Sequence, residues 1–369
     1  MTLNAKRALV AFGVLILAAI AILSFGPSVD VRPSNSPFDV NDGATAEQRL
    51  VSPTDMGDMN MQTLPVFNFS LPEFQGITHW WNTANNEPLT PEDLRGKVVL
   101  VDFWTYSCIN CIRTFPFMRE MHEKYGNNGL VIIGVHTPEF AFEANPDNVS
   151  REIEKNNLNY PVALDPDYKT WRAYSNRYWP AGYFFDHMGR LRRTHFGEGE
   201  YQESEEAIRS LLREAGYELD EMGMTDATTP DFSKIKTHET YFGLLRGREF
   251  TQSAGSRGEA TAYSNAKTPT ADRWNVEGTW TFEDEYVVAH SDDAKFFFNV
   301  QASKMHLVLE SEDGAPKLIE IFVDGEKTRD ITVQDAELYD IAEFPDAARH
   351  HVEIRIQDAG VRFFAATFS

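Results

Sequence analysis

The feature that most constrains the fold is the apolar run KVVLVDFW at residues 97–104, which ends just before the only two cysteines of the chain, Cys108 and Cys111. The run is rich in β-branched residues and contains one acid, Asp102, which is typical of a strand buried on both faces. A helical pattern follows to about Tyr125, and the apolar run at 130–135 predicts a second strand. Strand, helix and strand in this order indicate a right-handed βαβ unit with a parallel strand pair.

Further alternation of strand and helix patterns extends this unit to an α/β domain over residues 63–217. A hydroxyl, a proline and two acids at Thr90–Asp93 predict a helix start. The other expected elements are strands at 66–71, 80–81, 160–164, 181–185 and 191–196, and helices at 148–156, 168–176 and 203–215.

After a linker with some local order at residues 218–273, the hydrophobic period changes to two at Trp274. Short strands without a clear helix between them predict a small all-β sandwich of the jelly-roll kind over 274–369. The expected strands are 278–282, 295–300, 305–309, 317–323, 352–356 and 362–368, with Asp324-Gly325 as a hairpin turn. Trp274, Trp280 and Phe282 could stack on a sugar ring, but packing in the core is the favoured interpretation.

The N-terminal 26 residues differ from the rest. Lys6 and Arg7 precede the uncharged apolar run at 8–25, whose length as a helix, roughly 27 Å, just crosses a bilayer core. We therefore expect a membrane anchor at residues 1–26, in preference to a cleaved signal, followed by a flexible linker at 27–62. Both interpretations place the rest of the chain outside the cytoplasm. A net charge of −22 argues against binding to nucleic acid.

Two cysteines three residues apart allow four kinds of site. A structural zinc site needs four ligands, and no second cysteine pair exists. Haem attachment needs histidine directly after the second cysteine, where Ile112 stands. A purely structural bridge would close too small a loop to restrain the chain much. Redox exchange remains, with no metal and no cofactor beyond the cysteine pair itself.

The positions of the cysteines predict their roles. A cysteine at a helix N-terminus is favoured as the thiolate, so Cys108 should be the exposed attacking group. Cys111, one turn deeper, should resolve the mixed disulfide. Asp102 is expensive to bury, and it could shuttle a proton to or from Cys111. Pro180 is a candidate cis-proline that faces the cysteines.

The same pattern suggests a groove in which an extended substrate would pair with the backbone beside Pro180. The side chains expected to line it are Trp104, Tyr106, Ser107 and Trp179. His136 could approach the cysteines, although a satisfied loop histidine is the favoured interpretation. Arg113 could support the Cys108 thiolate, and a solvated surface arginine is equally consistent with the sequence.

These motifs resemble those of a known family. The segment VDFWTYSCINC, with Pro116 and the Trp179-Pro180 dipeptide, resembles a thioredoxin-fold active site. Residues 131–142 and the insertion to Asp165 resemble the membrane-anchored TlpA-like branch, which is related to peroxiredoxins. The blocks GVHTPE, NRYWPA and FGEG and the stretch 237–243 are similar to the soluble C-terminal region of DipZ-type proteins, in which a sandwich like a carbohydrate-binding module follows.

The resemblance implies a membrane-tethered thiol:disulfide oxidoreductase, extracytoplasmic and more a reductant of protein clients than an oxidant. DipZ-type proteins carry a multi-helix membrane domain that imports electrons, whereas this sequence has one apolar segment. Electrons would then come from a separate membrane donor of the CcdA or DsbD kind. Ser107 replaces the tryptophan usual in the family, so a redox potential cannot be copied from thioredoxin. The alternatives are a thiol peroxidase and an envelope glycan-binding protein with a vestigial redox domain.

Overall fold

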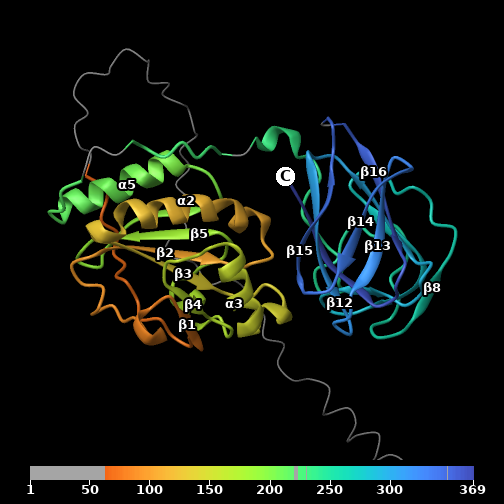
Figure 1. Cartoon of the computed structure of the whole chain (residues 1–369), viewed down its shortest axis with the longest axis horizontal. Helices are drawn as coiled ribbons and strands as arrows, with labels where there is room; N and C mark the ends of the chain where they lie inside the picture. The colour runs from red at the N-terminus through yellow and green to blue at the C-terminus, as the bar shows by residue number, and fades with distance from the viewer. Residues whose placement is uncertain (1–62, 220–222, 230, 347) are drawn as a thin grey trace, which may run out of the picture. The chain divides into compact units, whose positions relative to one another are not determined.

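The computed structural model describes residues 63–219, 223–229, 231–346 and 348–369 (Figure 1). The expected anchor at 1–26 and linker at 27–62 lie outside these residues. Within the described part of the chain, no helix has the length and apolar character needed to cross a bilayer. The described residues form an α/β domain and an all-β domain, which belong to one compact unit.

The α/β domain is built on a six-stranded sheet in the order β1-β4-β3-β2-β5-β6. The strands are β1 (His79–Trp81), β2 (Val98–Trp104), β3 (Leu130–His136), β4 (Val162–Leu164), β5 (Ala181–Phe185) and β6 (Leu191–Phe196). β2 pairs in parallel with β3, as predicted, and antiparallel with β5. Every residue of β2 is buried, because helices or loops cover both faces of this central strand.

Among the described residues, four α-helices accompany the sheet, and α2 and α5 lie on the same side of it (Figure 1). Phe115, Met118 and Met121 of α2 and Ile208 and Leu211 of α5 share one hydrophobic core with β2. The helices are α2 (Ile109–Tyr125), α3 (Pro146–Lys155), α4 (Lys169–Ala173) and α5 (Tyr201–Glu214), with 3₁₀ turns η1 (Ala84–Asn86), η2 (Gly126–Asn128), η3 (Ala141–Ala144) and η4 (Phe232–Lys234).

One expected element near the start of the domain is wrong. Residues 66–71 form no regular strand, although an isolated bridge joins Ser70 to Arg190 and backbone hydrogen bonds link Phe67 and Leu71 to residues 189–191. The helix start expected at Thr90 is a single turn. Thr90 and Asp93 do exchange the predicted capping hydrogen bonds, but Gly96, at a φ of +81°, reverses the chain before a helix can continue.

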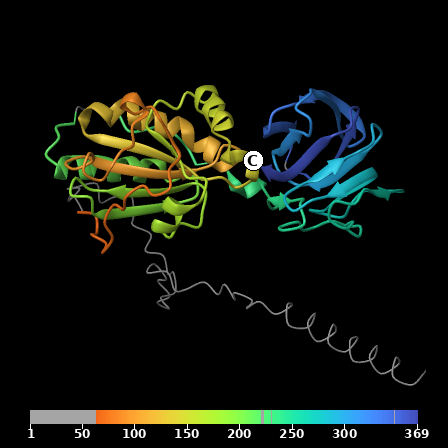
Figure 2. The same cartoon turned by 90° about the horizontal axis from the view of Figure 1, so that it is seen from below.

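The second domain consists of antiparallel strands that curve around a common core (Figure 2). Its main strand order is β14-β13-β16-β11-β9-β10-β17-β12-β15, with β7 paired to β17 and β8 to β9, so it is a sandwich close to a closed barrel. The strands are β7 (Thr240–Tyr241), β8 (Thr261–Tyr263), β9 (Trp274–Phe282), β10 (Val287–Ala289), β11 (Lys295–Val300), β12 (Lys304–Ser311), β13 (Lys317–Val323), β14 (Glu326–Val333), β15 (Glu337–Glu343), β16 (His350–Ile356) and β17 (Val361–Phe368).

Several local expectations for this domain are confirmed. Asp324 and Gly325 both have positive φ and form the turn between β13 and β14. Trp274, Trp280 and Phe282 are at most 2% exposed and belong to the core, so their rings are not available to stack on a sugar.

A short loop after β3, in the first domain, contacts the second domain. Phe140 packs with Val308 and Phe364 of the second domain in a small apolar cluster. Beside it, the Glu139 carboxylate accepts hydrogen bonds from the Tyr241 hydroxyl at 2.6 Å and from Arg246 at 2.8 Å. The loop therefore has partners in both domains.

Candidate functional site

The two cysteines lie where β2 gives way to α2. Cys108 is the N-cap residue of α2, and its sulfur accepts a hydrogen bond from the Cys111 backbone N–H at 3.3 Å. Both are free thiols; Cys108 is half-buried and Cys111 is fully buried. Cys108 is therefore the more exposed of the two cysteines, and Cys111 lies within the first turn of the helix.

Asp102 lies inside β2, 1% exposed, and neither carboxylate oxygen has a hydrogen-bond partner. Burial without compensating donors raises the pKa of Asp102 to about 8. Burial also raises the pKa of the Cys111 thiol, and the neighbouring Cys108 and the charge of Asp102 raise it further. Both groups hold their protons at neutral pH, so Cys111 can act as a nucleophile only if its proton is removed.

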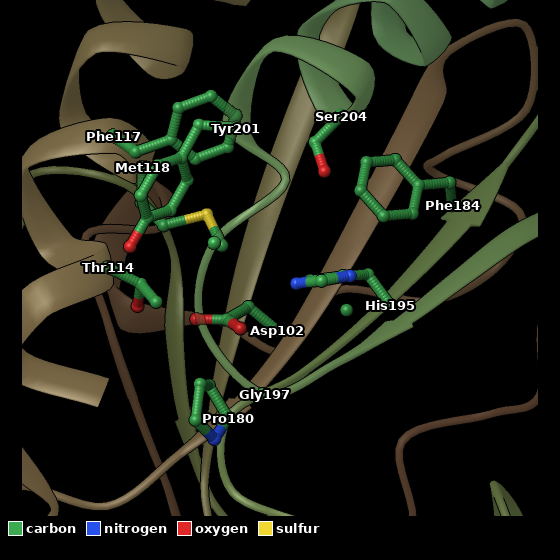
Figure 3. Close-up of a pocket in the computed structure, with 12 residues that line it drawn as sticks. Asp102, Thr114, Phe117, Met118, Pro180, Phe184, His195, Gly197, Tyr201 and Ser204 are labelled. Atoms are coloured by element: carbon green, nitrogen blue, oxygen red, sulfur yellow. The ribbon is translucent and has the colours of Figure 1, made fainter. Parts of the chain in front are cut away.

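The Trp179–Pro180 peptide bond is cis, as the sequence suggested. Pro180 immediately precedes β5, and it lines the same small cavity as Asp102 (Figure 3). The Trp179 indole N–H donates to the carbonyl oxygen of Thr137 at 3.0 Å, which ties the proline loop to the end of β3.

The structure changes the interpretation of the expected groove. Trp104 is fully buried and packs edge-on against Phe115 and His136, because it lies on the core face of β2. Ser107 is also buried, with its hydroxyl donating to Glu143 at 2.7 Å. These two side chains support the site from inside and do not line a surface groove.

The other two residues of the expected groove lie at open clefts. Trp179 lines a cleft of about 280 Å³ together with Tyr168, Tyr241 and Arg246. Tyr106, although only 1% exposed, forms part of the wall of a cleft of about 570 Å³ beside Ile109 and Ile112 of the active-site helix. Both clefts take residues from the two domains.

His136 and Arg113 are both engaged elsewhere. His136 ends β3 and is fully buried, with its ring stacked on Tyr106; burial lowers its pKa to about 3, so it stays neutral. It is a core residue and not the loop histidine that was expected. The Arg113 guanidinium donates to the Glu198 carboxylate at 2.5 Å and 2.7 Å, and Glu198 is only 3% exposed. Arg113 is thus neither solvated nor committed to the Cys108 sulfur.

One buried acid next to the cysteines was missed by the sequence analysis. Glu143 is fully buried and accepts hydrogen bonds from the backbone N–H groups of Ser107, Glu139 and Phe140. Burial, assisted by the charge of Glu139, raises its pKa to about 7. Glu143 therefore fixes the backbone that leads into Cys108. Its only sequence signal was an acid inside the otherwise apolar segment FAFEA.

Comparison with known proteins agrees with this architecture. Residues 65–194 match the model of the AhpC/TSA family, and residues 237–369 match the model of the thioredoxin-like C-terminal domain. The chain is 38% identical over 242 residues to protein DipZ of Mycobacterium tuberculosis. The aligned region makes up 64% of this chain but only 34% of the DipZ protein. The chain is also 30% identical over 145 residues to the thiol-disulfide oxidoreductase YkuV of Bacillus subtilis. This aligned region makes up 39% of the chain and 95% of YkuV.

A thioredoxin-like sheet, a C-x-x-C pair at the start of α2 and a cis-proline directly before β5 are the features of a thiol-disulfide exchange protein. The chain belongs to the thioredoxin-like thiol-disulfide oxidoreductases, which are enzymes, and it is similar to the DipZ and ResA proteins. It spans about a third of the length of the DipZ proteins that it matches.

Proposed function

We propose that the Cys108–Cys111 pair reduces disulfides of protein clients outside the cytoplasm. The Cys108 sulfur attacks a client disulfide, and one client sulfur leaves as a thiolate. Cys111 then loses its proton and attacks the Cys108 sulfur, which releases the second client sulfur. The client gains two electrons and the enzyme is left with a Cys108–Cys111 disulfide. The observation that supports this order is one accessible sulfur above one buried sulfur.

The reducing direction rests on the resemblance of the active-site segment to the membrane-anchored TlpA-like branch. The Cys108 sulfur receives one backbone N–H, from Cys111, and the nearby Arg113 is paired with Glu198. The reduction potential of the cysteine pair tests the direction: a value near that of thioredoxin, roughly −270 mV, marks a reductant, and a value near about −120 mV marks an oxidant.

The membrane tether and the electron donor also belong to this proposal. The apolar run at 8–25 supports an anchor in the lipid bilayer, and the similarity to DipZ supports a role in the cell envelope. The dithiol would be regenerated by a membrane donor of the CcdA or DsbD kind. A glycan ligand for the second domain is less well supported, because its three candidate aromatic side chains are in the core.

Two variants test the exchange reaction. Cys108→Ser should abolish reduction of insulin and of a synthetic disulfide peptide, because no accessible sulfur remains. Cys111→Ser should accumulate a mixed disulfide between Cys108 and the peptide, detectable by mass spectrometry after acid quenching. Circular dichroism spectra that match the parent chain would show that both variants fold. Full reducing activity in either variant would contradict the mechanism.

A thiol peroxidase is the second candidate, because residues 65–194 match the AhpC/TSA family. Stopped-flow mixing of the reduced chain with hydrogen peroxide separates the two functions. A peroxidase must react much faster than a free thiol, whereas a disulfide reductase should react no faster than one. The intrinsic tryptophan fluorescence can follow the reaction, since Trp104 and Trp179 pack around the site.

A further inference from the structure

The sheet places a glycine between two polar residues beneath the cysteines. Asp102 of β2 is directly opposite Gly182 of β5, and Gly182 is directly opposite His195 of β6. Residues that pair across neighbouring strands have side chains on the same face. Asp102 and His195 are therefore on one face of the sheet, two strands and about 10 Å apart, and the residue between them has no side chain.

A small cavity occupies the space above Gly182. Its volume is about 20 Å³, which suits one water molecule. Figure 3 shows the Asp102 carboxylate and the His195 ring directed into this cavity, with Thr114 and Ser204 at its wall. The Thr114 hydroxyl donates to the Cys111 carbonyl oxygen at 2.8 Å, so it can only accept from a water. A buried water needs two to four polar partners, and these four side chains can provide them.

The buried polar atoms that have no hydrogen-bond partner in the protein also indicate a water molecule in this cavity. Both Asp102 oxygens and the His195 Nε2 are buried without a protein partner. Buried polar groups almost always have a partner, from the protein or from water. One water in the cavity would satisfy both residues, and the side chains need not touch.

His195 connects this cavity to solvent. Its other ring nitrogen, Nδ1, lies 3.3 Å from the Glu200 carboxylate, and the Glu200 side chain is 60% exposed. Arg193 donates to the same Glu200 oxygen at 2.7 Å, which holds this carboxylate in place. The other titratable groups around the path are Cys111, Tyr160 and Tyr201 beside Asp102, and Arg193 and Glu200 beside His195.

We propose that one water above Gly182 and the side chain of His195 carry protons between Asp102 and solvent during disulfide exchange. This inference rests on the proposed function. The His195 Nδ1–H donates to Glu200, and Nε2 accepts from the water. When Asp102 releases its proton through the water to Nε2, the Nδ1 proton leaves to Glu200 and solvent. The new Asp102 carboxylate then takes the proton of Cys111, whose sulfur attacks Cys108.

One proton therefore leaves the site for each client disulfide reduced. When a donor reduces the Cys108–Cys111 disulfide again, Cys111 takes up a proton and the path runs inward. The inward step restores the starting tautomer of His195, so the relay returns to its initial state after each full cycle. His195 acts through Asp102 and water and is a positioning and relay residue, not one that touches the client.

The test follows one turnover of the reduced full chain with a synthetic disulfide peptide. Acid quenching and mass spectrometry give the rates at which the mixed disulfide forms and decays. His195→Gln keeps a polar side chain that does not carry protons in this range. It should slow decay by about tenfold to a hundredfold near neutral pH, because positioned proton transfer contributes about 10²-fold at the lower end. Formation of the mixed disulfide by Cys108 should be unchanged.

Gly182→Ala tests the water with His195 intact. The added Cβ would lie 3.3 Å from the Phe184 ring, on the cavity side, where it takes the space of the water. It should slow decay as His195→Gln does. His187→Gln, at the turn after β5, is the matched control and should leave both rates unchanged. Unfolding midpoints of all variants identify any loss of structure.

The pH profile separates a relay from a merely structural role. The deficit of His195→Gln should shrink above about pH 8, where Asp102 begins each turnover as a carboxylate and needs no outgoing proton. A decay rate within about twofold of the parent chain in His195→Gln, or a deficit that is the same at every pH, would overturn the relay while disulfide exchange still stands. Failure of the parent chain to form a mixed disulfide would instead overturn the proposed function.

Discussion

Replacing Asp102 by asparagine should make the chain more stable at neutral pH. The parent carboxyl is fully buried without a protein partner, and its pKa is raised to about 8, against about 3.9 in an unfolded chain. Since the folded pKa is the higher one, the associated stability is complete below about pH 4 and is lost as the pH rises to about 8. Asparagine has nearly the same shape and does not titrate, so it removes this loss.

The magnitude follows from the pKa difference. At pH 7 the folded chain must hold a proton that the unfolded chain has released over about three pH units. Each unit corresponds to about 1.4 kcal/mol, so Asp102→Asn should increase the free energy of unfolding by at most about 4 kcal/mol at pH 7. Near pH 3 the two chains should differ little, because both side chains are then largely neutral in both states.

The assay is urea unfolding of the reduced chain at several pH values, followed by tryptophan fluorescence and circular dichroism. Contributions of the second domain are common to both chains and cancel in the difference. An Asp102→Asn chain whose advantage did not grow between pH 4 and pH 8 would refute the reasoning. It would mean that the folded chain stabilises the charged carboxylate as well as bulk water does.

Asp186 provides a matched control with the opposite sign. Burial opposes its ionisation, but hydrogen bonds from the backbone N–H of Arg190 and Met188 and from the Arg190 side chain outweigh burial and lower its pKa. Its stabilising contribution is present above about pH 4 and is lost only as the pH falls through the lowered value. Asp186→Asn should therefore destabilise the chain at pH 7.

Three further substitutions probe the surroundings of the site. Glu143→Ala should lower the free energy of unfolding by about 3 kcal/mol or more and slow the attack of Cys108, because several buried donors lose their acceptor; urea unfolding and peptide reduction test both effects. Arg113→Met should lower the free energy of unfolding by about 3 kcal/mol, because it leaves the buried Glu198 side chain unpaired. Adding Glu198→Leu should restore much of this loss, and urea unfolding of the double variant tests it. Trp280→Ala should cost about 3 to 5 kcal/mol, measured by urea unfolding, and leave peptide reduction unchanged.

The sequence was most informative where the determinants are local. β5 and β6 have the predicted bounds, because β5 is a short apolar run and a turn at residues 186–190 separates it from β6. Cys108 caps α2 and Asp102 is buried in β2 because both follow from one continuous strand-to-helix pattern. By contrast, β14 and β15 were missed. Only two of the eight residues of β14 are buried, so its sequence lacks the alternation that identifies a strand.

Contacts between residues far apart in the chain could not be predicted from the sequence. The bond from Ser107 to Glu143 spans 36 residues, and the pairing of Arg113 with Glu198 spans 85. Trp104 lies next to the active-site segment in the chain, but the pleat of β2 directs its side chain to the core. Local pattern fixes which face a residue lies on once the strand is known, but it does not say which distant loop meets that face.

The loop after β3 limits how freely these domains can be recombined. Glu143 fixes the backbone before Cys108, whereas Glu139 and Phe140 in the same loop have their partners in the second domain. A chimaera with an unrelated second domain would expose the Phe140 ring and leave Glu139 without Tyr241 and Arg246. The two domains are therefore expected to be inherited as a pair, and substitutions at Tyr241 or Phe364 should be accompanied by changes in this loop.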